Sequence, residues 1–260
     1  MNHRPRKRLG QHFLHDRNII RRIIEEIAPH ETSPVVEIGP GPGALTIPLL
    51  KLVSELDVIE VDRDLAGELE FTCRELGNLN IHVADALEID FCKLKPGKLI
   101  IVGNLPYNIS TPLLFHLLTQ VNCIKYMLFM MQLEVVNRIC AMPGTKEYGR
   151  LSVMVQSVCN VKKAFNIPPG AFKPPPKVES SLIRLVPDNH RTSRINNRTI
   201  FSDIVKQAFN HRRKTIRNSL NGIVDKPVLE QAGVNPALRA ENLSVEDFIR
   251  LANLQNSSGI

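Results

Sequence analysis

Long apolar runs are missing from this 260-residue sequence, although 43% of its residues are hydrophobic. No stretch approaches the roughly 20 apolar residues that a bilayer-spanning helix needs. The first eight residues are basic and no apolar stretch follows them, so the pattern of a secretory signal is absent. The length allows one or two domains, and the composition excludes collagenous, low-complexity and wholly disordered chains. We therefore expect a globular protein that is neither secreted nor inserted in a membrane.

Cysteine and metal-binding patterns are also scarce. The five cysteines are an odd number and none forms a C-x-x-C pair, which predicts reduced, mostly buried thiols in a cytoplasmic protein. His12 and His15 have no cysteine or carboxylate at ligand spacing, and an H-E-x-x-H sequence is absent. The sequence therefore predicts no metal site.

The net charge of +7 is concentrated in one region. Residues 161–220 contain 13 Lys and Arg against 3 acidic residues, whereas residues 55–90 contain 11 acidic residues against 2 basic ones. This asymmetry indicates that one part of the protein handles a polyanion and another part handles something else. The alternative is a solvated surface with unevenly distributed charge.

Predicted strands and helices alternate along the first two thirds of the chain. This order favours an α/β fold with a mostly parallel seven-stranded sheet that is covered by helices on both faces. Asp16 is the expected cap of the first helix. The predicted strands are 34–38, 56–61, 80–83, 98–102, 126–131, 161–167 and 178–186, and the predicted helices are 18–27, 44–53, 64–76, 111–119, 133–141 and 150–159.

The end of the chain has a different pattern. A proline-rich loop joins the last two predicted strands, so we expect them to pair antiparallel at one edge of the sheet. Residues 187–198 are polar and basic, which is typical of a domain boundary. We therefore expect one domain over residues 1–187 and a small helical domain over 188–260, helical from 199 to 254 and including a capping box from Ser244 to Asp247.

A glycine-rich segment, E-I-G-P-G-P-G at residues 37–43, follows the first apolar strand and precedes a helix. Gly39 and Gly41 would let the backbone turn sharply and approach a ligand closely. The spacing differs from the dinucleotide fingerprint and resembles the E/D-x-G-x-G-x-G segment of class I S-adenosylmethionine-dependent methyltransferases. The alternative is a glycine-rich turn that only joins a strand to a helix.

Two carboxylates follow the next strands of the predicted sheet. Glu60 lies about 20 residues beyond the glycines, where an acidic side chain can accept hydrogen bonds from both hydroxyls of a ribose. Asp85 follows the third strand and could accept from an adenine amino group, because ligands of open α/β sheets gather at the carboxyl ends of strands. The neighbouring Asp62 is expected to face water.

The fourth strand ends in the sequence G-N-L-P-Y at residues 103–107. The lone pair of adenine N6 is delocalised into the ring, so a catalyst must concentrate electron density on that nitrogen. Asn104 Oδ1 and the Leu105 carbonyl could accept its two N–H bonds, while Pro106 keeps the turn rigid and Tyr107 stacks on the base. The segment resembles the N/D-P/L-P-Y/F signature of methyltransferases that modify exocyclic amino nitrogens. The alternative is a structural turn with a core tyrosine.

Together, five stretches resemble the small-subunit ribosomal RNA adenine dimethyltransferases, the KsgA family. They are residues 8–14, 37–43, 103–111, 172–178 and 207–220. The resemblance implies transfer of two methyl groups from S-adenosylmethionine to N6 of each of two adjacent adenosines near the 3′ end of 16S rRNA, in a precursor particle, by a cytoplasmic monomer. It also implies that cofactor contacts come from His12, Leu14, Gly39, Glu60, Asp85 and Asn104. The first of these is often Asn elsewhere in the family.

The resemblance also assigns roles outside the cofactor site. Phe172 lies in a proline-stiffened loop that could hold its ring out of the core, and the family match implies that this ring covers one face of the target adenine. The alternative is a phenylalanine that anchors the loop on the sheet. RNA contacts are expected from Arg212, Arg213, Lys214 and Arg217, and from residues 4–8, which could instead be a nuclear signal or a disordered tail.

Two rival functions use the same fold. One is a resistance-type methyltransferase that modifies an adenosine of large-subunit rRNA, which the Q-A-F-N-H-R-R-K-T stretch at residues 207–215 disfavours. The other is a non-catalytic RNA-binding factor for ribosome assembly or transcription. That interpretation predicts substitutions at the glycines of residues 37–43 or at Asn104, and the sequence keeps the glycines and Asn104.

Overall fold

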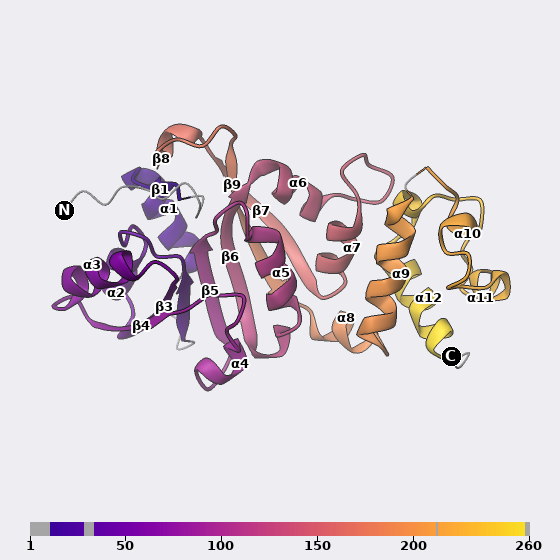
Figure 1. Cartoon of the computed structure of the whole chain (residues 1–260), viewed down its shortest axis with the longest axis horizontal. Coiled ribbons are helices and arrows are strands. Elements are labelled where there is room, and N and C mark those ends of the chain that lie inside the picture. The colour runs from indigo at the N-terminus through magenta and orange to yellow at the C-terminus, as the bar shows by residue number, and fades with distance from the viewer. Residues whose placement is uncertain (1–10, 29–33, 212, 258–260) are drawn as a thin grey trace. The chain divides into compact units, whose positions relative to one another are not determined.

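A mixed sheet of seven strands, in the order β4-β3-β2-β5-β6-β9-β7, is the framework of the chain (Figure 1). The computed structural model describes residues 11–28, 34–211 and 213–257. Strands β4, β3, β2, β5 and β6 pair in parallel with their neighbours, and β9 pairs antiparallel with β6. The strands are β2 (Val35–Ile38), β3 (Glu55–Glu60), β4 (Asn78–Val83), β5 (Leu99–Asn104), β6 (Ile124–Gln132), β7 (Cys159–Ile167) and β9 (Ser180–Pro187).

The central strands β2, β5 and β6 are nearly continuous apolar runs. Residues 99–102 of β5 are fully buried, as expected for a strand that has helices on both of its faces. The two last long strands, β7 and β9, are neighbours at one edge of the sheet, which confirms the position expected from the proline-rich loop between them. The observed fold is therefore the predicted α/β class.

Helices α1 (Arg17–Ile27), α2 (Thr46–Leu50) and α3 (Arg63–Cys73) share one hydrophobic core with the sheet. Ile19, Ile23 and Ile27 of α1 are buried in it, and Asp16 caps this helix by accepting from the backbone N–H groups of Asn18 and Ile19, as predicted. Helix α5 (Ser110–Leu118) lies in front of the sheet in Figure 1. Short helical segments α4 (Phe91–Leu94) and η2 (Val121–Cys123) precede β5 and β6.

A second, two-stranded sheet was not predicted from the sequence. Strand β1 (Phe13–Leu14) pairs antiparallel with β8 (Phe172–Lys173), which follows the 3-10 turn η3 (Pro169–Ala171). This pairing joins the start of the chain to the proline-rich loop before β9. Strands of two residues give no periodicity, so their pairing depends on contacts that the sequence does not show.

The chain divides into two compact units, one ending at Val136 and resuming over Lys162–Pro187, the other containing Asn137–Val161 and the residues from Asp188 onward. The sequence analysis placed a boundary after residue 187, and it placed 137–161 in the first domain. Tyr148 and Phe248 of the second unit both contact the ring of Phe209.

The second unit is mostly helical. Helix α6 (Leu133–Cys140) begins before Asn137, and the other elements are α7 (Arg150–Gln156), α8 (Asn189–Ser193), α9 (Arg198–Asn210), α10 (Ile216–Ser219), α11 (Lys226–Gln231), η4 (Ala240–Asn242) and α12 (Val245–Ser257).

Helix boundaries in the second unit confirm one prediction and correct two. Ser244 Oγ accepts a hydrogen bond from the backbone N–H of Asp247, and the backbone N–H of Ser244 donates to the Asp247 carboxylate. The predicted capping box is therefore present. The helical pattern expected from 199 to 254 is interrupted, because α9 ends at Asn210 and α10 begins at Ile216. Helix α7 ends at Gln156 rather than at 159, where Cys159 already begins β7.

The prediction that all cysteines are free thiols is wrong for one pair. Cys92 in α4 and Cys123 in η2 form a disulfide, although they are 31 residues apart. The two short segments bring these side chains together before adjacent strands, and no C-x-x-C spacing signals it. Cys73 and Cys159 are buried free thiols, and Cys140 is half-buried.

Among the helices in the described parts of the chain, none combines the length and the apolar character that a bilayer crossing requires. Over the same residues, no group of three or more His, Cys, Asp or Glu side chains is placed to hold a metal ion.

Candidate active site

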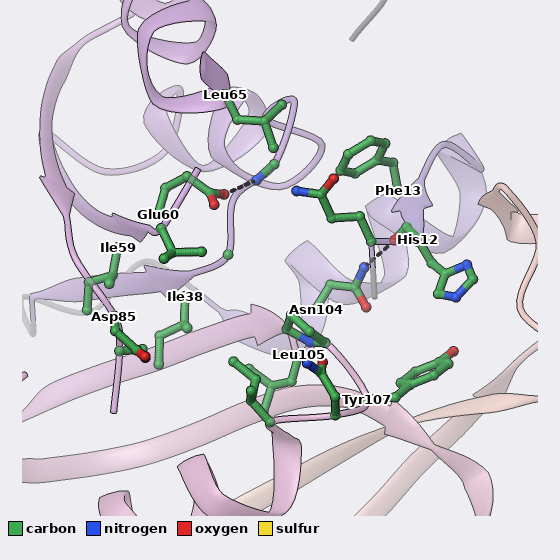
Figure 2. Close-up of a pocket in the computed structure, with 18 of the residues that line it drawn as sticks. His12, Phe13, Ile38, Ile59, Glu60, Leu65, Asp85, Asn104, Leu105 and Tyr107 are labelled. Atoms are coloured by element: carbon green, nitrogen blue, oxygen red, sulfur yellow. Dashed lines mark hydrogen bonds between the residues drawn. The ribbon is translucent and has the colours of Figure 1, made fainter. Parts of the chain in front are cut away.

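A cavity of about 170 Å³ lies where β2, β3, β4 and β5 end (Figure 2). Each strand contributes residues at or just beyond its carboxyl end: Gly39 and Gly41 after β2, Glu60 as the last residue of β3, Asp85 after β4, and residues 104–109 from the last residue of β5 onward. Residues 11–13 complete the lining. The parallel sheet therefore brings together residues between Ile38 and Ile109, as ligand sites of open α/β sheets do.

The glycine-rich segment passes close to the N-terminal strand β1. Gly41 has φ +54°, and a Cβ atom there would lie 3.1 Å from the ring of Phe13. Gly103 is tighter still, since its Cβ would lie 2.5 Å from the carbonyl oxygen of Ile38. Gly103 therefore requires glycine for reasons of space, whereas Gly41 is favoured by its backbone angle and by the tight approach of Phe13.

Glu60 is held at the cavity wall by two backbone donors. Its Oε2 accepts from the N–H of Gly41 at 3.2 Å, and its Oε1 accepts from the N–H of Asp62 at 2.9 Å. The side chain is 5% exposed, and this burial raises the pKa of its carboxyl above the ordinary value. Figure 2 shows the carboxylate beside the glycine turn, where it can accept hydrogen bonds from a polar ligand.

Apolar side chains form the wall next to Glu60. Ile38, Ile59, Val61 and Leu65 line the cavity, and Val61 is 54% exposed even though it is apolar. Asp85 stands beyond them as an exposed carboxylate that accepts from the N–H of Leu87 at 2.9 Å. The sequence analysis did not select this wall, although its members lie at or just beyond the same strand ends. A flat, largely apolar ring with polar groups at its edge fits this arrangement.

Asp62 does not face water as expected. It is 1% exposed, and its Oδ1 accepts from the N–H of Asp64 and so caps α3. Directly behind the glycines, Glu37 is equally buried and accepts from the hydroxyl of Thr46 at 2.7 Å. Burial raises the pKa of Glu37 to about 7, and the hydrogen bond from Thr46 partly opposes this shift.

Asn104 is anchored by the start of the chain. Its Nδ2 donates to the main-chain carbonyl of His12 at 2.8 Å, which assigns the two ends of the amide group. Figure 2 shows Oδ1 on the side of the amide away from His12. Next to it, the carbonyl of Pro106 accepts from the N–H groups of Ile109 and Ser110, so the segment turns directly into α5. The Asn104 oxygen is thus presented on a rigid turn.

Tyr107 is fixed at both its hydroxyl and its ring. The hydroxyl forms a 2.8 Å hydrogen bond with Ser180 Oγ of β9, and the ring stacks on the imidazole of His12 with centroids 5.5 Å apart. His12 Nδ1 donates in turn to the carbonyl of Pro174 at 2.8 Å. Burial raises the pKa of Tyr107, which keeps the ring a neutral phenol.

Two predicted site residues have side chains that are buried in the core. Phe172 is 2% exposed and Leu14 is 5% exposed, and both belong to the hydrophobic core beneath the small β1–β8 sheet. They are directly paired across that ladder, so their side chains project to the same, buried face. The expectation that the proline-rich loop holds Phe172 out of the core is therefore wrong in this structure.

The family of the chain follows from comparison with known proteins. The model of the family described as ribosomal RNA adenine dimethylase matches residues 2–257. The chain belongs to this family. The match confirms the resemblance drawn from the five sequence stretches, and the cavity described above is the candidate active site of this ribosomal RNA adenine dimethylase.

Relatives of this dimethylase are similar over nearly their whole length. The "Ribosomal RNA small subunit methyltransferase A" of Nitrosococcus oceani is 50% identical over 255 residues, and that of Xanthomonas oryzae pv. oryzae is 51% identical over 251, with 96% of each chain covered in both cases. A solved dimethyladenosine transferase from Plasmodium falciparum has a TM-score of 0.85 at 28% identity, covering 96% of this chain and 99% of that one. The 23S rRNA methyltransferase ErmE has a TM-score of 0.70 at 26% identity, covering 94% and 99%. These structures confirm the predicted methyltransferase fold.

The basic residues predicted to bind RNA lie elsewhere in this dimethylase. Arg213 and Lys214 are exposed in the segment between α9 and α10, and Arg217 is exposed on α10 itself. Arg212 and residues 4–8 are outside the described residues. Ile216 and Leu220 of the same region are fully buried.

Proposed function

We propose that this enzyme transfers methyl groups from S-adenosylmethionine to N6 of two adjacent adenosines near the 3′ end of 16S rRNA, giving N6,N6-dimethyladenosines in a precursor of the small ribosomal subunit. The observation that carries the proposal is the Asn104 amide. Its nitrogen is engaged by His12, and its oxygen is presented beside Leu105 and Tyr107 at the wall of the cavity.

The cavity residues fit the proposed cofactor. Glu60 offers a fixed carboxylate for two ribose hydroxyls, and the apolar wall of Ile38, Ile59 and Val61 suits the faces of an adenine ring. Asp85 can accept a hydrogen bond from the adenine amino group, and a Cβ at Gly41 would press on the ring of Phe13, which lines the cavity. When bound, S-adenosylmethionine supplies a methyl group on a sulfonium, which is already a good leaving group.

The chain itself performs the positioning that the reaction needs. Asn104 Oδ1 and the Leu105 carbonyl accept hydrogen bonds from the two N6–H groups of the target adenine. These bonds turn the nitrogen lone pair away from conjugation with the ring. Tyr107, neutral and fixed by Ser180, offers its ring for stacking on the base. No general base is required for attack, because the product ammonium can release its proton to solvent.

The similarity to named relatives favours small-subunit rRNA over large-subunit rRNA as the substrate. Proteins that are about half identical over 96% of both chains bear the name of small-subunit methyltransferases. ErmE, a large-subunit enzyme by its name, has 26% identity and a lower TM-score than the dimethyladenosine transferase. The non-catalytic alternative is disfavoured by the intact set of Gly39, Glu60 and Asn104 around the cavity.

The proposal extends to the setting of the reaction. We expect the unit that carries the cavity to bind cofactor and the target base, and the residues after 187 to help hold RNA through Arg212, Arg213, Lys214 and Arg217. We expect a cytoplasmic monomer. This location rests on the ribosomal substrate and not on the cysteines, two of which form a disulfide.

The test supplies labelled S-adenosylmethionine with unmethylated small-subunit particles or large-subunit particles in parallel reactions. Primer extension then maps blocked adenosines in each rRNA. We expect two adjacent stops near the 3′ end of 16S rRNA only. Stops in large-subunit rRNA would support the rival enzyme, and no label in either rRNA would support the non-catalytic factor.

A further inference from the structure

Four exposed cations lie in α1 and in the loop around β8, the two segments that follow or pair with β1, whose Phe13 lines the cavity. We call them the rim cations: Arg17 and Arg21 of α1, and Lys173 and Lys177 of the loop around β8. The sequence analysis counted Lys173 and Lys177 only as part of the basic region 161–220, and the proposed function gives none of the four a role. All four lie in the same compact unit as the cavity.

Lys173 is tied to the cavity wall by strand pairing. It lies directly opposite Phe13 in the β1–β8 ladder, while Leu14 lies opposite Phe172. Residues directly opposite each other on antiparallel strands project to the same face. Leu14 and Phe172 fill the buried face, so Lys173 shares the other face with Phe13, which lines the cavity. The hydrogen bond from His12 to Pro174 holds the next residue of the loop at the same place.

Helix α1 starts against the same loop. The N–H of His15 donates to the carbonyl of Ala171 at 2.9 Å, which places the first turn of α1 beside η3 and β8. Ile19, Ile23 and Ile27 face the core, so the opposite side of the helix is exposed. Arg17 and Arg21 are one turn apart and therefore neighbours on that exposed side.

The charges of α1 are reversed relative to what stabilises a helix. Arg17, Arg21 and Arg22 occupy its first half, whereas Glu25 and Glu26 occupy its last turn. The helix dipole favours the opposite order, with anions at the N-terminus and cations at the C-terminus. Only the Asp16 cap follows that preference. The arginines are therefore not explained by helix stability.

The rim cations are also not used in ion pairs. Within the parts of the chain that the structure describes, none of the four lies in ion-pair range of a carboxylate, in contrast to Lys95, which contacts Glu55 and Asp57. The carboxylates in or next to their segments are Asp16, which caps α1, Glu25 and Glu26 in the last turn of α1, and Glu179, which follows Lys177 by two residues. Within the described residues, these four exposed cations are therefore available for an anionic partner.

We infer that the rim cations bind phosphates of the RNA strand on either side of the target adenosine. The inference rests on the proposed function, since a base that enters the cavity brings its own backbone to the cavity rim. A basic surface along that backbone neutralises phosphates without reading sequence. The rim is a contact distinct from the Arg213–Arg217 segment, and it acts on the nucleotides closest to the reacting base.

The experiment compares two quadruple variants that lose the same charge. The rim variant changes Arg17, Arg21, Lys173 and Lys177 to Gln. The control variant changes four other exposed cations to Gln. They precede the amino-terminal ends of β3, β4 and β5, whereas the cavity lies at the carboxyl ends: Lys51, Arg74, Lys93 and Lys98. Binding to unmethylated small-subunit particles is measured from about 50 to about 200 mM salt, together with affinity for S-adenosylmethionine.

We expect the rim variant to bind particles at least tenfold more weakly, with the slope of log affinity against log salt flatter by about 3 units, at about 0.7 to 0.9 per phosphate contact. The control variant should change the slope by less than about one unit. Cofactor affinity should be unchanged in both. If the rim variant does not fold, the pairs Arg17→Gln with Arg21→Gln and Lys173→Gln with Lys177→Gln are measured separately, each with about half the effect.

Equal slopes for the rim and control variants would overturn the inference while leaving the proposed function intact, provided that the unchanged enzyme still methylates the particles. An unchanged enzyme that neither binds nor methylates particles would instead contradict the proposed function. Binding is repeated with a protein-free rRNA fragment that contains the target adenosines. A rim effect on particles but not on this fragment would identify a ribosomal protein as the partner and would also overturn the inference.

Discussion

The side-chain nitrogen of Asn104 and the main-chain oxygen of His12 form a 2.8 Å hydrogen bond across 92 residues of sequence. The bond joins the end of β5 to the N-terminal segment that also stacks on Tyr107 and bonds to Pro174. Because Nδ2 donates to His12, the amide is oriented with Oδ1 on the side away from His12, where it can accept from a substrate. The orientation of the proposed catalytic oxygen thus depends on a backbone atom of the N-terminal segment.

Changing Asn104 to Ala removes Oδ1 and should act on the transition state. We expect the single-turnover methyl-transfer rate to fall by about 100-fold or more, as for the loss of other oriented polar groups, while particle binding changes little. Asn104→Asp is the matched variant, because it keeps the shape but places a carboxylate against the His12 carbonyl. It should also be slow. A rate close to that of the unchanged enzyme in Asn104→Ala would remove this residue from the mechanism.

Changing Glu60 to Ala should weaken cofactor binding. The carboxylate is pre-positioned by Gly41 and Asp62, and hydrogen bonds to a charged group are worth roughly 1.5–3 kcal/mol. Calorimetric titration should therefore show S-adenosylmethionine affinity falling by about tenfold or more. Glu60→Gln keeps one acceptor oxygen and should have an intermediate affinity. Unchanged affinity in folded Glu60→Ala protein would show that the ribose is held elsewhere.

Phe172 should behave as a core residue. Its ring is 2% exposed and packs with Leu14, so Phe172→Ala should lower the free energy of unfolding by about 3–5 kcal/mol. Urea denaturation measures this. Phe172→Leu should retain most of the stability and a methyl-transfer rate within a few-fold of the unchanged enzyme. A stable Phe172→Ala protein that has lost methyl transfer would restore the role of this ring on the adenine.

Glu37 should make stability depend on pH. Burial raises its folded pKa from 4.5 to about 7, so the stability it contributes is present below pH 4.5 and is lost as the pH rises through about 7. Glu37→Gln does not titrate. Its free energy of unfolding relative to the unchanged protein should therefore rise between pH 5 and pH 8, by up to about 3 kcal/mol. A difference that is constant with pH would place the carboxyl in a more polar environment.

The sequence predicted the parts of the site that follow from local order. Gly41, Glu60 and Asn104 each follow or end a strand, and parallel strands bring such positions to one edge whatever the details of packing. The family match added the N-terminal segment around His12, which periodicity alone would have missed because β1 has only two residues.

Residues whose place depends on long-range pairing could not be predicted. Phe172 is buried because β8 pairs with β1, and the Cys92–Cys123 disulfide forms because α4 and η2 meet before adjacent strands. The break between α9 and α10 was missed because Phe209, Ile216 and Leu220 keep an apolar pattern across it. Apolar spacing reports which residues face the core, and a loop can satisfy it as well as a helix.

The central claim is dimethylation of small-subunit rRNA. Nucleoside mass spectrometry of particles that have been incubated with the enzyme measures it most directly. Particles treated with the unchanged enzyme and S-adenosylmethionine are digested and their modified adenosines counted per rRNA molecule. We expect two N6,N6-dimethyladenosines in 16S rRNA, none in large-subunit rRNA, and none with Asn104→Ala. A product that stays at N6-methyladenosine, or that forms only in large-subunit rRNA, would contradict the claim.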